Sequence, residues 1–152
     1  MECVILIGLP ASGKSTFYRE RFASTHEHVS KDLLKNNSRP ERRQQDLIDA
    51  ALSSGRSVVV DNTNATRESR AAIIAMAKDH GAVVHGYYFP AEPADALRRN
   101  RQRTGAGRVP DVAIFTIRKK LEAPLRDEGF DRLFEVTLDE KGKRFEVEER
   151  AG

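Results

Sequence analysis

The sequence predicts an α/β protein, a three-layer sandwich in which helices cover a central, mainly parallel sheet. Two apolar runs without alternation, at residues 3–7 and 58–60, are typical of strands buried on both faces. Segments with helical periodicity separate the predicted strands, which indicates βαβ units with right-handed crossovers. The 152 residues suffice for one domain with a single core.

Composition and charge narrow the class of protein. Apolar residues make up 39% and charged residues 32% of the chain, a balance typical of a globular protein with a charged surface. Cys3 is the only cysteine, so no disulfide forms within the chain, and we expect a reducing, cytoplasmic location. No apolar run has the length of a signal peptide or a membrane span, and we expect no membrane partner. The net charge of +3 does not by itself indicate nucleic-acid binding.

A glycine-rich segment follows the first predicted strand and precedes a predicted helix. Residues 8–15, Gly-Leu-Pro-Ala-Ser-Gly-Lys-Ser, match G-x-x-x-x-G-K-[ST], the phosphate-binding P-loop, in the strand–turn–helix context that this motif requires. Gly8 and Gly13 allow the backbone to approach a phosphate closely. Backbone N–H groups and the positive end of the helix then face the anion. We therefore expect the chain to bind a nucleoside triphosphate.

The residues of this loop have expected roles. Lys14 is placed to contact the β- and γ-phosphates, and the Ser15 hydroxyl to ligate Mg²⁺. The expected cofactors are therefore ATP, as the phosphate donor, and Mg²⁺, although the sequence leaves GTP open as a donor. The expected ATP-binding residues of the loop are Gly8, Pro10, Ala11, Ser12, Gly13, Lys14, Ser15 and Thr16.

The next segment carries a candidate catalytic carboxylate. Residues 28–30 form a short predicted strand, and Asp32 follows it, across the expected cleft from Lys14. Asp32 is placed to act as a general base on an acceptor hydroxyl, and the alternative is that it caps the next helical segment. A loop at residues 36–40 and a helix that ends near Gly55 complete this unit.

The second buried strand ends at Asp61, and Asn62, Thr63 and Asn64 follow it. Ligands of open α/β sheets bind at the carboxyl ends of the strands, which places Asp61 and Asn62 near a Mg²⁺ ion or an acceptor. An apolar strand that ends in an aspartate also resembles a Walker B strand. The other interpretation is a turn rich in helix-capping residues, and both can hold at once.

The remaining chain continues the alternation and ends in a hairpin. A helix over residues 67–80, capped by Thr66 or Asn64, precedes a strand over residues 82–89. Residues 134–138 and 144–148 predict a C-terminal β-hairpin. Between the strand at residues 82–89 and this hairpin lies a helix capped by Asp111. Three of its apolar residues are expected to face inward: Val112, Phe115 and Leu121.

Arginines cluster in the segment before this helix. Five arginines and no acid fall within residues 98–108, beside a Gly-containing turn. We interpret residues 98–110 as a lid that closes over phosphates, and the alternative is a solvated helix face. In the lid interpretation Arg103, with Arg99 in support, neutralises charge on the transferring phosphoryl group, and both belong to the ATP-binding set.

Taken together, these motifs resemble the kinase domain of 5′-hydroxyl polynucleotide kinases, over roughly residues 3–138. Asp-Asn-Thr-Asn and Arg-Lys-x-x-Glu-Ala-Pro are far more selective than the P-loop alone. The segments that carry the resemblance are residues 8–17, 30–32, 58–64, 99–110, 118–124 and 128–130.

The resemblance implies transfer of the γ-phosphate of ATP to a 5′-hydroxyl end of DNA or RNA, as in nucleic acid repair, with nucleic acid as the substrate. Residues 1–152 would then be one P-loop kinase domain. Asp32 would be the general base and would complete the catalytic set with Lys14 and Arg103. The implied acceptor-binding residues are Asp32, Lys35, Asn62 and Asn64.

The chain departs from the family pattern at three positions. Lys35 stands where the phage-type pattern has an arginine, and Phe115 and Ile117 replace tyrosines of the animal pattern. Two other functions stay open: a P-loop kinase of a small metabolite or nucleoside, and a nucleotide-gated binding module without transfer. The sequence does not indicate the oligomeric state.

Overall fold

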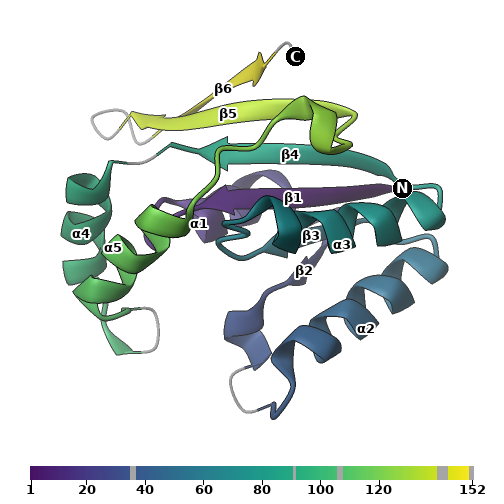
Figure 1. Cartoon of the computed structure of the whole chain (residues 1–152), viewed down its shortest axis with the longest axis horizontal. Coiled ribbons are helices and arrows are strands. Elements are labelled where there is room, and N and C mark those ends of the chain that lie inside the picture. The colour runs from purple at the N-terminus through teal and green to yellow at the C-terminus, as the bar shows by residue number, and fades with distance from the viewer. Residues whose placement is uncertain (35–36, 91, 106–107, 140–143, 151–152) are drawn as a thin grey trace.

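The computed structural model describes residues 1–34, 37–90, 92–105, 108–139 and 144–150, apart from the side chain of Asp32. Within these ranges six strands form one sheet in the order β2-β3-β1-β4-β5-β6. All neighbouring pairs are parallel except β5 and β6, which are antiparallel. The predicted sandwich with its C-terminal hairpin is therefore confirmed (Figure 1). The strands are β1 (Glu2–Gly8), β2 (Glu27–Val29), β3 (Val58–Asp61), β4 (Val83–Phe89), β5 (Arg132–Asp139) and β6 (Arg144–Arg150).

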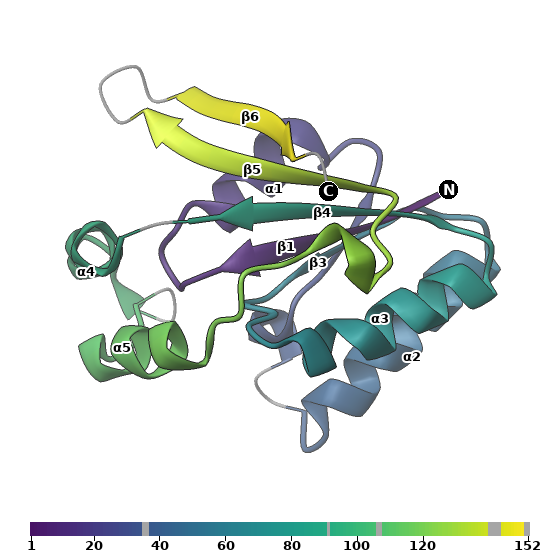
Figure 2. The same ribbon diagram turned by 45° about the horizontal axis from the view of Figure 1, so that its top comes forward.

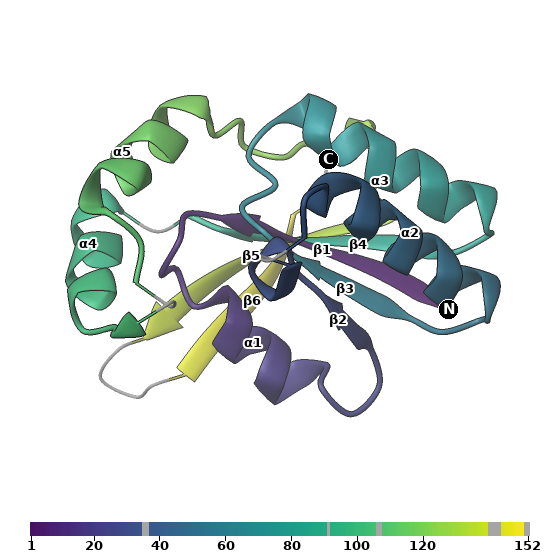
Figure 3. The same ribbon diagram turned by 90° about the horizontal axis from the view of Figure 1, so that it is seen from below.

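Helices cover both faces of the sheet, with α1 on one face and α2 and α3 on the other (Figure 3). Two more helices, α4 and α5, lie side by side beyond the carboxyl ends of β1 and β4 (Figure 1). The hairpin of β5 and β6 forms one edge of the sheet (Figure 2). The helices are α1 (Lys14–Arg21), α2 (Pro40–Ser53), α3 (Arg67–Asp79), α4 (Pro93–Arg101) and α5 (Asp111–Lys120), with the short 3-10 helices η1 (Lys31–Leu34) and η3 (Arg126–Glu128).

Alternation along β1 divides the apolar side chains between two cores. Ile5 packs with Ile73 on the α2–α3 face, whereas Val4 and Leu6 pack with Phe17 on the α1 face. The strand is therefore apolar throughout, as expected of a strand covered on both sides. Cys3 belongs to the first of these cores, and burial raises the pKa of its thiol to about 12.

The C-terminal hairpin supports the phosphate-binding loop. Phe145 of β6 packs edge-on against Phe17 of α1, with ring centroids 5.2 Å apart. A Cβ atom at Gly13 would lie 3.1 Å from Cε1 of Phe145, and Gly13 has a φ of +99°. Both the close approach and the left-handed backbone favour glycine there.

The buried apolar face of helix α5 is narrower than the sequence predicts. Ile114 is buried against Leu9 and Ala96, and Leu121 packs at the edge of a core. Val112 and Phe115 are 69% and 47% exposed, so the prediction that they face inward is wrong. The reason is the position of α5: it packs beside α4 at the end of the sheet, where no sheet face covers its second side. Pro110 and not Asp111 is the N-cap, and the Asp111 carboxylate accepts from Asn100 and Arg101. Of the two predicted N-caps of α3, Thr66 is the cap, in a capping box with Ser69, and Asn64 donates to the Leu6 carbonyl instead.

A buried ion pair fixes the loop between β3 and α3. Arg70 of α3 pairs in a bidentate manner with Glu128 of η3, at 2.8 Å and 3.0 Å, and their side chains are 0% and 3% exposed. The third donor of Arg70, Nη1, contacts the carbonyl oxygen of Asn64 at 2.9 Å. The pair therefore joins two loops that are far apart in the sequence. No helix in the described ranges combines the length and the apolarity needed to cross a membrane.

We expect Glu128→Gln to lower the free energy of unfolding by about 3–5 kcal/mol, because it leaves the Arg70 charge buried without its partner. Asp127→Asn is the matched control, since Asp127 pairs with Arg67 at side-chain exposures of 70% and 46%. That exposed pair predicts a loss below about 1 kcal/mol. Urea unfolding of both variants measures the difference. Equal losses would show that burial of the Arg70 pair adds nothing to stability.

Candidate functional site

A cavity of about 430 Å³ lies where the P-loop, the loop after β3 and the segment between α4 and α5 meet. It lies at the carboxyl ends of β1 and β3, where ligands of open α/β sheets bind. Residues with predicted roles that line it are Pro10, Ala11, Lys14, Ser15, Asp61, Asn62, Asn64 and Arg103.

The backbone of the P-loop has the shape of an anion-binding turn. Ala11 and Gly13 both have left-handed φ angles, +62° and +99°. The left-handed region is strained for alanine and such strain clusters at ligand-binding sites. The loop is anchored at its start, where the Gly8 N–H donates to the Thr63 carbonyl at 3.1 Å. A Cβ atom at Gly8 would lie 3.0 Å from Cβ of Phe89, a close approach that favours glycine there as well.

Lys14 is buried within this loop. Its ammonium group donates to the carbonyl oxygens of Gly8 at 3.0 Å and Leu9 at 2.6 Å. An ammonium group has three donors and is a compact point charge. The contacts therefore hold a positive charge at the loop that is expected to bind phosphates.

Strand alternation directs Asp61 toward α1. Val59 faces the α1 core, and Asp61, two residues later on β3, lies on the same side of the sheet. Ser15 Oγ of α1 donates to Asp61 Oδ2 at 2.8 Å. His28 Nε2 of β2 lies 2.8 Å from the same oxygen. Asp61 thus joins three elements through one carboxylate atom.

The charge state of Asp61 follows from these contacts. Burial favours the neutral acid, but the hydrogen bond with His28, the charge of Lys14 and the hydrogen bond with Ser15 together outweigh it. The pKa of Asp61 therefore lies below its usual value of 3.8. An ionised carboxylate only accepts hydrogen bonds, so Ser15 and His28 are both donors to it.

The oxygen atoms of Ser15 and Asp61 fit a Mg²⁺ ion that is held together with phosphates. Mg²⁺ takes oxygen ligands and is bound by one or two protein groups plus substrate phosphates, not by an all-protein cage. The described part of the chain has no cluster of three or more His, Cys, Asp or Glu residues that could hold a metal. Ser15 was the predicted ligand, and Asp61 lies beside it.

Asn62 and Asn64 line the cavity and also hold loops in place. Asn62 Oδ1 accepts from the backbone N–H of Lys31 at 2.8 Å, and its amide donates to Gln44 of α2. Asn64, at a φ of +45°, donates to the carbonyl oxygen of Leu6 at 2.7 Å, so it ties the loop to β1. Sequence reasoning identified neither structural role.

The predicted acceptor residues near η1 are only partly described. The backbone of Asp32 lies in η1, next to Lys31, which lines the cavity. The side chain of Asp32 and the whole of Lys35 lie outside the described residues.

A buried asparagine, Asn100, joins the two ends of the predicted lid by hydrogen bonds to the backbone of Val109. Asn100 Nδ2 donates to the Val109 carbonyl at 2.7 Å, and Asn100 Oδ1 accepts from the Val109 N–H at 2.9 Å. The segment from 98 to 110 therefore comprises the end of α4 and its connection to α5, of which residues 106–107 are not described. Arg103 lines the cavity, and Arg99 Nη1 lies 3.5 Å from the Ala11 carbonyl oxygen.

A second hollow of about 210 Å³ lies on the other side of the P-loop, between α4 and β5. Ser12 and Arg99 line it together with the apolar side chains of Phe89, Val136 and Leu138. Of the predicted ATP-binding residues, only Thr16 lies on an exposed surface, where it accepts from Arg19 at 3.1 Å.

Sequence reasoning missed His28 and Asn100. Both are polar residues within a strand or a helix, and that placement is the only signal that the sequence offers for a buried hydrogen-bonding role. Their partners, Asp61 and Val109, are identified only once the elements are assembled.

A family model described as "AAA domain" matches residues 3–124. Among curated proteins, the chain is 30% identical over 139 residues to the bifunctional polynucleotide phosphatase/kinase of Schizosaccharomyces pombe, and the match covers 89% of this chain and 33% of that protein. The resemblance that the motifs indicate is thus confirmed. The chain spans about a third of the length of the first curated relatives it matches.

Solved structures share the fold at lower identity. Kti12 of Chaetomium thermophilum, in complex with ADP-AlF3, has a TM-score of 0.66 and 18% identity, and 93% of each chain is covered. A gluconokinase of Sinorhizobium meliloti 1021 has a TM-score of 0.66 and 21% identity, with 90% of this chain and 82% of that chain covered. These matches confirm the predicted P-loop kinase fold.

The lowered pKa of Asp61 predicts a pH-dependent contribution to stability. Since the folded pKa lies below the unfolded value of 3.8, this contribution is complete above about pH 5 and is lost as the pH falls through 3.8 and then through the folded pKa. We expect the difference in unfolding free energy between wild type and Asp61→Asn to shrink progressively below about pH 5. Urea unfolding over a pH series measures it. A difference that grows on acidification would mean that the fold holds this carboxyl protonated.

Proposed function

The chain belongs to the AAA domain family, and from that premise we propose that it is a P-loop kinase that transfers the γ-phosphate of ATP to a 5′-hydroxyl end of DNA or RNA. The observation that carries the proposal is one cavity that is lined both by residues expected to bind the phosphate donor and by a segment expected to bind the acceptor. The P-loop, with Lys14 and Ser15, forms one wall, and the start of η1, which carries Asp32, approaches from another. We propose residues 1–152 as one kinase domain.

In this proposal each side chain acts on a different part of the transfer. Lys14 binds the β- and γ-phosphates, and Arg103 of the lid stabilises the charge of the transferring group. Asp32 accepts the proton of the acceptor hydroxyl. Ser15 and Asp61 hold Mg²⁺, which supplies charge neutralisation on the phosphates when bound. The remaining P-loop residues contact the phosphates through their backbone.

The second hollow suits the base of the donor nucleotide. Leu138 borders it, together with Phe89 and Val136, which are each 2% exposed, and the guanidinium of Arg99 is able to stack on an aromatic base. The carboxylates of Glu92 and Asp95 also line this hollow. The hollow lies across the P-loop from the cavity, so a triphosphate would pass over the loop between the two.

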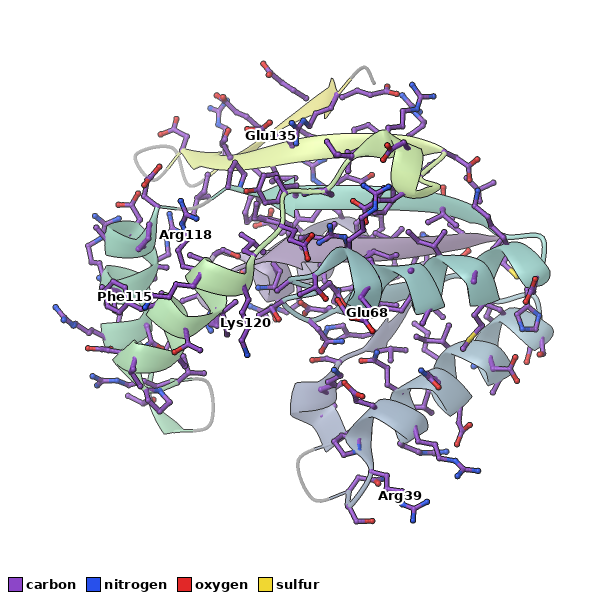
Figure 4. The ribbon with its side chains drawn as sticks, in the orientation of Figure 1. Arg39, Glu68, Phe115, Arg118, Lys120 and Glu135 are labelled. Carbon is purple, nitrogen blue, oxygen red and sulfur yellow. The ribbon has the colours of Figure 1, made fainter. Side chains whose placement is uncertain are left out.

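Basic side chains at and beyond the cavity support a polyanionic acceptor, while Asp61 also lines the cavity and Lys31 pairs with Glu41. Arg39 extends from the segment before α2, and Lys120 extends from α5 on the opposite side (Figure 4). Lys31 and Arg103 line the cavity itself. Basic groups beyond the reacting centre are able to contact successive phosphates of a strand. Lys35, Asn62 and Asn64 are proposed to contact the nucleotide that carries the 5′-hydroxyl.

Transfer of label from γ-labelled ATP in Mg²⁺ tests the acceptor. The panel contains 5′-hydroxyl DNA, 5′-hydroxyl RNA, nucleosides and gluconate, with 5′-phosphorylated DNA as the matched control. We expect label on 5′-hydroxyl strands alone, at a rate that falls steeply with added salt. Label on a nucleoside or on gluconate alone would favour a metabolite kinase. ATP binding without any transfer would favour a nucleotide-gated binding module.

We expect Asp32→Asn to lower kcat by about 10²–10⁴, the usual contribution of a general base. Affinity for ATP should stay within about twofold, because Asp32 contacts the acceptor and not the donor. Glu41→Gln is the control, since Glu41 is an exposed carboxylate that pairs with Lys31 in the same region. Single-turnover kinetics and calorimetry measure the two quantities. Loss of ATP binding together with transfer would assign Asp32 a structural role.

A further inference from the structure

His28 contacts the metal-site carboxylate from outside the cavity. It lies on β2 in register with Val59, on the same side of the sheet as Asp61. Its Nε2 lies 2.8 Å from Asp61 Oδ2, the oxygen that also accepts from Ser15 at 2.8 Å. His28 does not line the cavity.

Two directional donors on one oxygen fix the orientation of a carboxyl group. A carboxylate that ligates an ion only accepts hydrogen bonds, so the hydrogen atom of the 2.8 Å contact belongs to His28 Nε2. The bond from Ser15 alone would leave the carboxyl group free to rotate about the Cβ–Cγ bond of Asp61. The bond from β2 removes that freedom and sets the plane in which the oxygens meet an ion.

The imidazole ring is itself held in place by α1. The ring of Tyr18 stacks on it, with centroids 4.1 Å apart and planes inclined by 14°. The Tyr18 hydroxyl donates to the His26 carbonyl at 2.8 Å, which fixes the phenol as well. Tyr18 lies three residues after Ser15, so both occupy the same side of α1. The helix that offers one proposed metal ligand therefore also holds the residue that orients the other.

We propose that His28 is a positioning residue for Mg²⁺: it orients the Asp61 carboxylate toward an ion bound with the nucleotide, and it contacts neither ion nor nucleotide. The inference rests on the proposed function only in requiring a Mg²⁺–nucleotide complex, whatever the acceptor. Removing the donor should therefore weaken ion binding and leave metal-free nucleotide binding intact.

Three variants separate this role from a general effect on folding. His28→Phe keeps a ring to stack on Tyr18 but has no N–H donor. His28→Gln restores a donor near the position of Nε2. His80→Phe is the matched control, because His80 pairs with Asp49 at 2.7 Å and is 23% exposed, against 2.8 Å and 25% for His28, and does not line the cavity.

The readouts are the affinity for ADP in Mg²⁺ and in EDTA, by calorimetry, and the affinity of the ADP complex for Mn²⁺, by electron paramagnetic resonance. We expect His28→Phe to lower Mn²⁺ affinity at least about tenfold, the usual effect of losing such a partner. ADP affinity in EDTA should stay within about twofold, and His28→Gln should recover most of the loss. His80→Phe should match wild type.

Several results would overturn the inference. One is an unchanged Mn²⁺ affinity in His28→Phe, and another is an equal loss of Mn²⁺ affinity in His28→Phe and His28→Gln. The others are weaker binding of ADP to His28→Phe in EDTA, and an ADP affinity of the wild type that Mg²⁺ does not change. Failure to label 5′-hydroxyl strands would overturn the proposed acceptor and leave these ion affinities to decide the role of His28.

Discussion

One buried carboxylate oxygen, Asp61 Oδ2, is the constraint on which the candidate site depends. It brings together α1 through Ser15, β2 through His28 and β3 through its own backbone. Burying a charge is unfavourable unless hydrogen bonds and opposite charge offset it, and here they do. Since the oxygen is fixed only when all three elements are in place, the same contacts that stabilise the fold also set the geometry of the proposed ion site.

Buried polar side chains perform the same task for the loops around the cavity. Asn64 ties the loop after β3 to β1, the Arg70–Glu128 pair joins that loop to η3, and Asn100 closes the segment between α4 and α5. Each offers several donors or acceptors in a fixed geometry, which an apolar contact lacks. The loops that carry the candidate site are therefore held by directional bonds, whereas the sheet behind them is held by apolar packing.

The sequence predicted the parts of this structure that rest on local patterns. The P-loop, the buried strands and the C-terminal hairpin follow from residue type and spacing, which stay the same in any tertiary context. The prediction that Val112 and Phe115 of α5 face inward was wrong, because burial of a helix face depends on what packs against it. His28 and Asn100 were missed because their hydrogen bonds join segments whose proximity only the assembled sheet and helices create.

The burial of Cys3 has a practical consequence for the study of motion in this protein. The thiolate is the reactive form of cysteine, and a buried thiol with a pKa of about 12 is protonated and shielded at neutral pH. Because it is the only cysteine, the native chain already provides an inert background. A single thiol introduced between α4 and α5 would take a fluorophore or a spin label selectively, with no prior removal of the natural one.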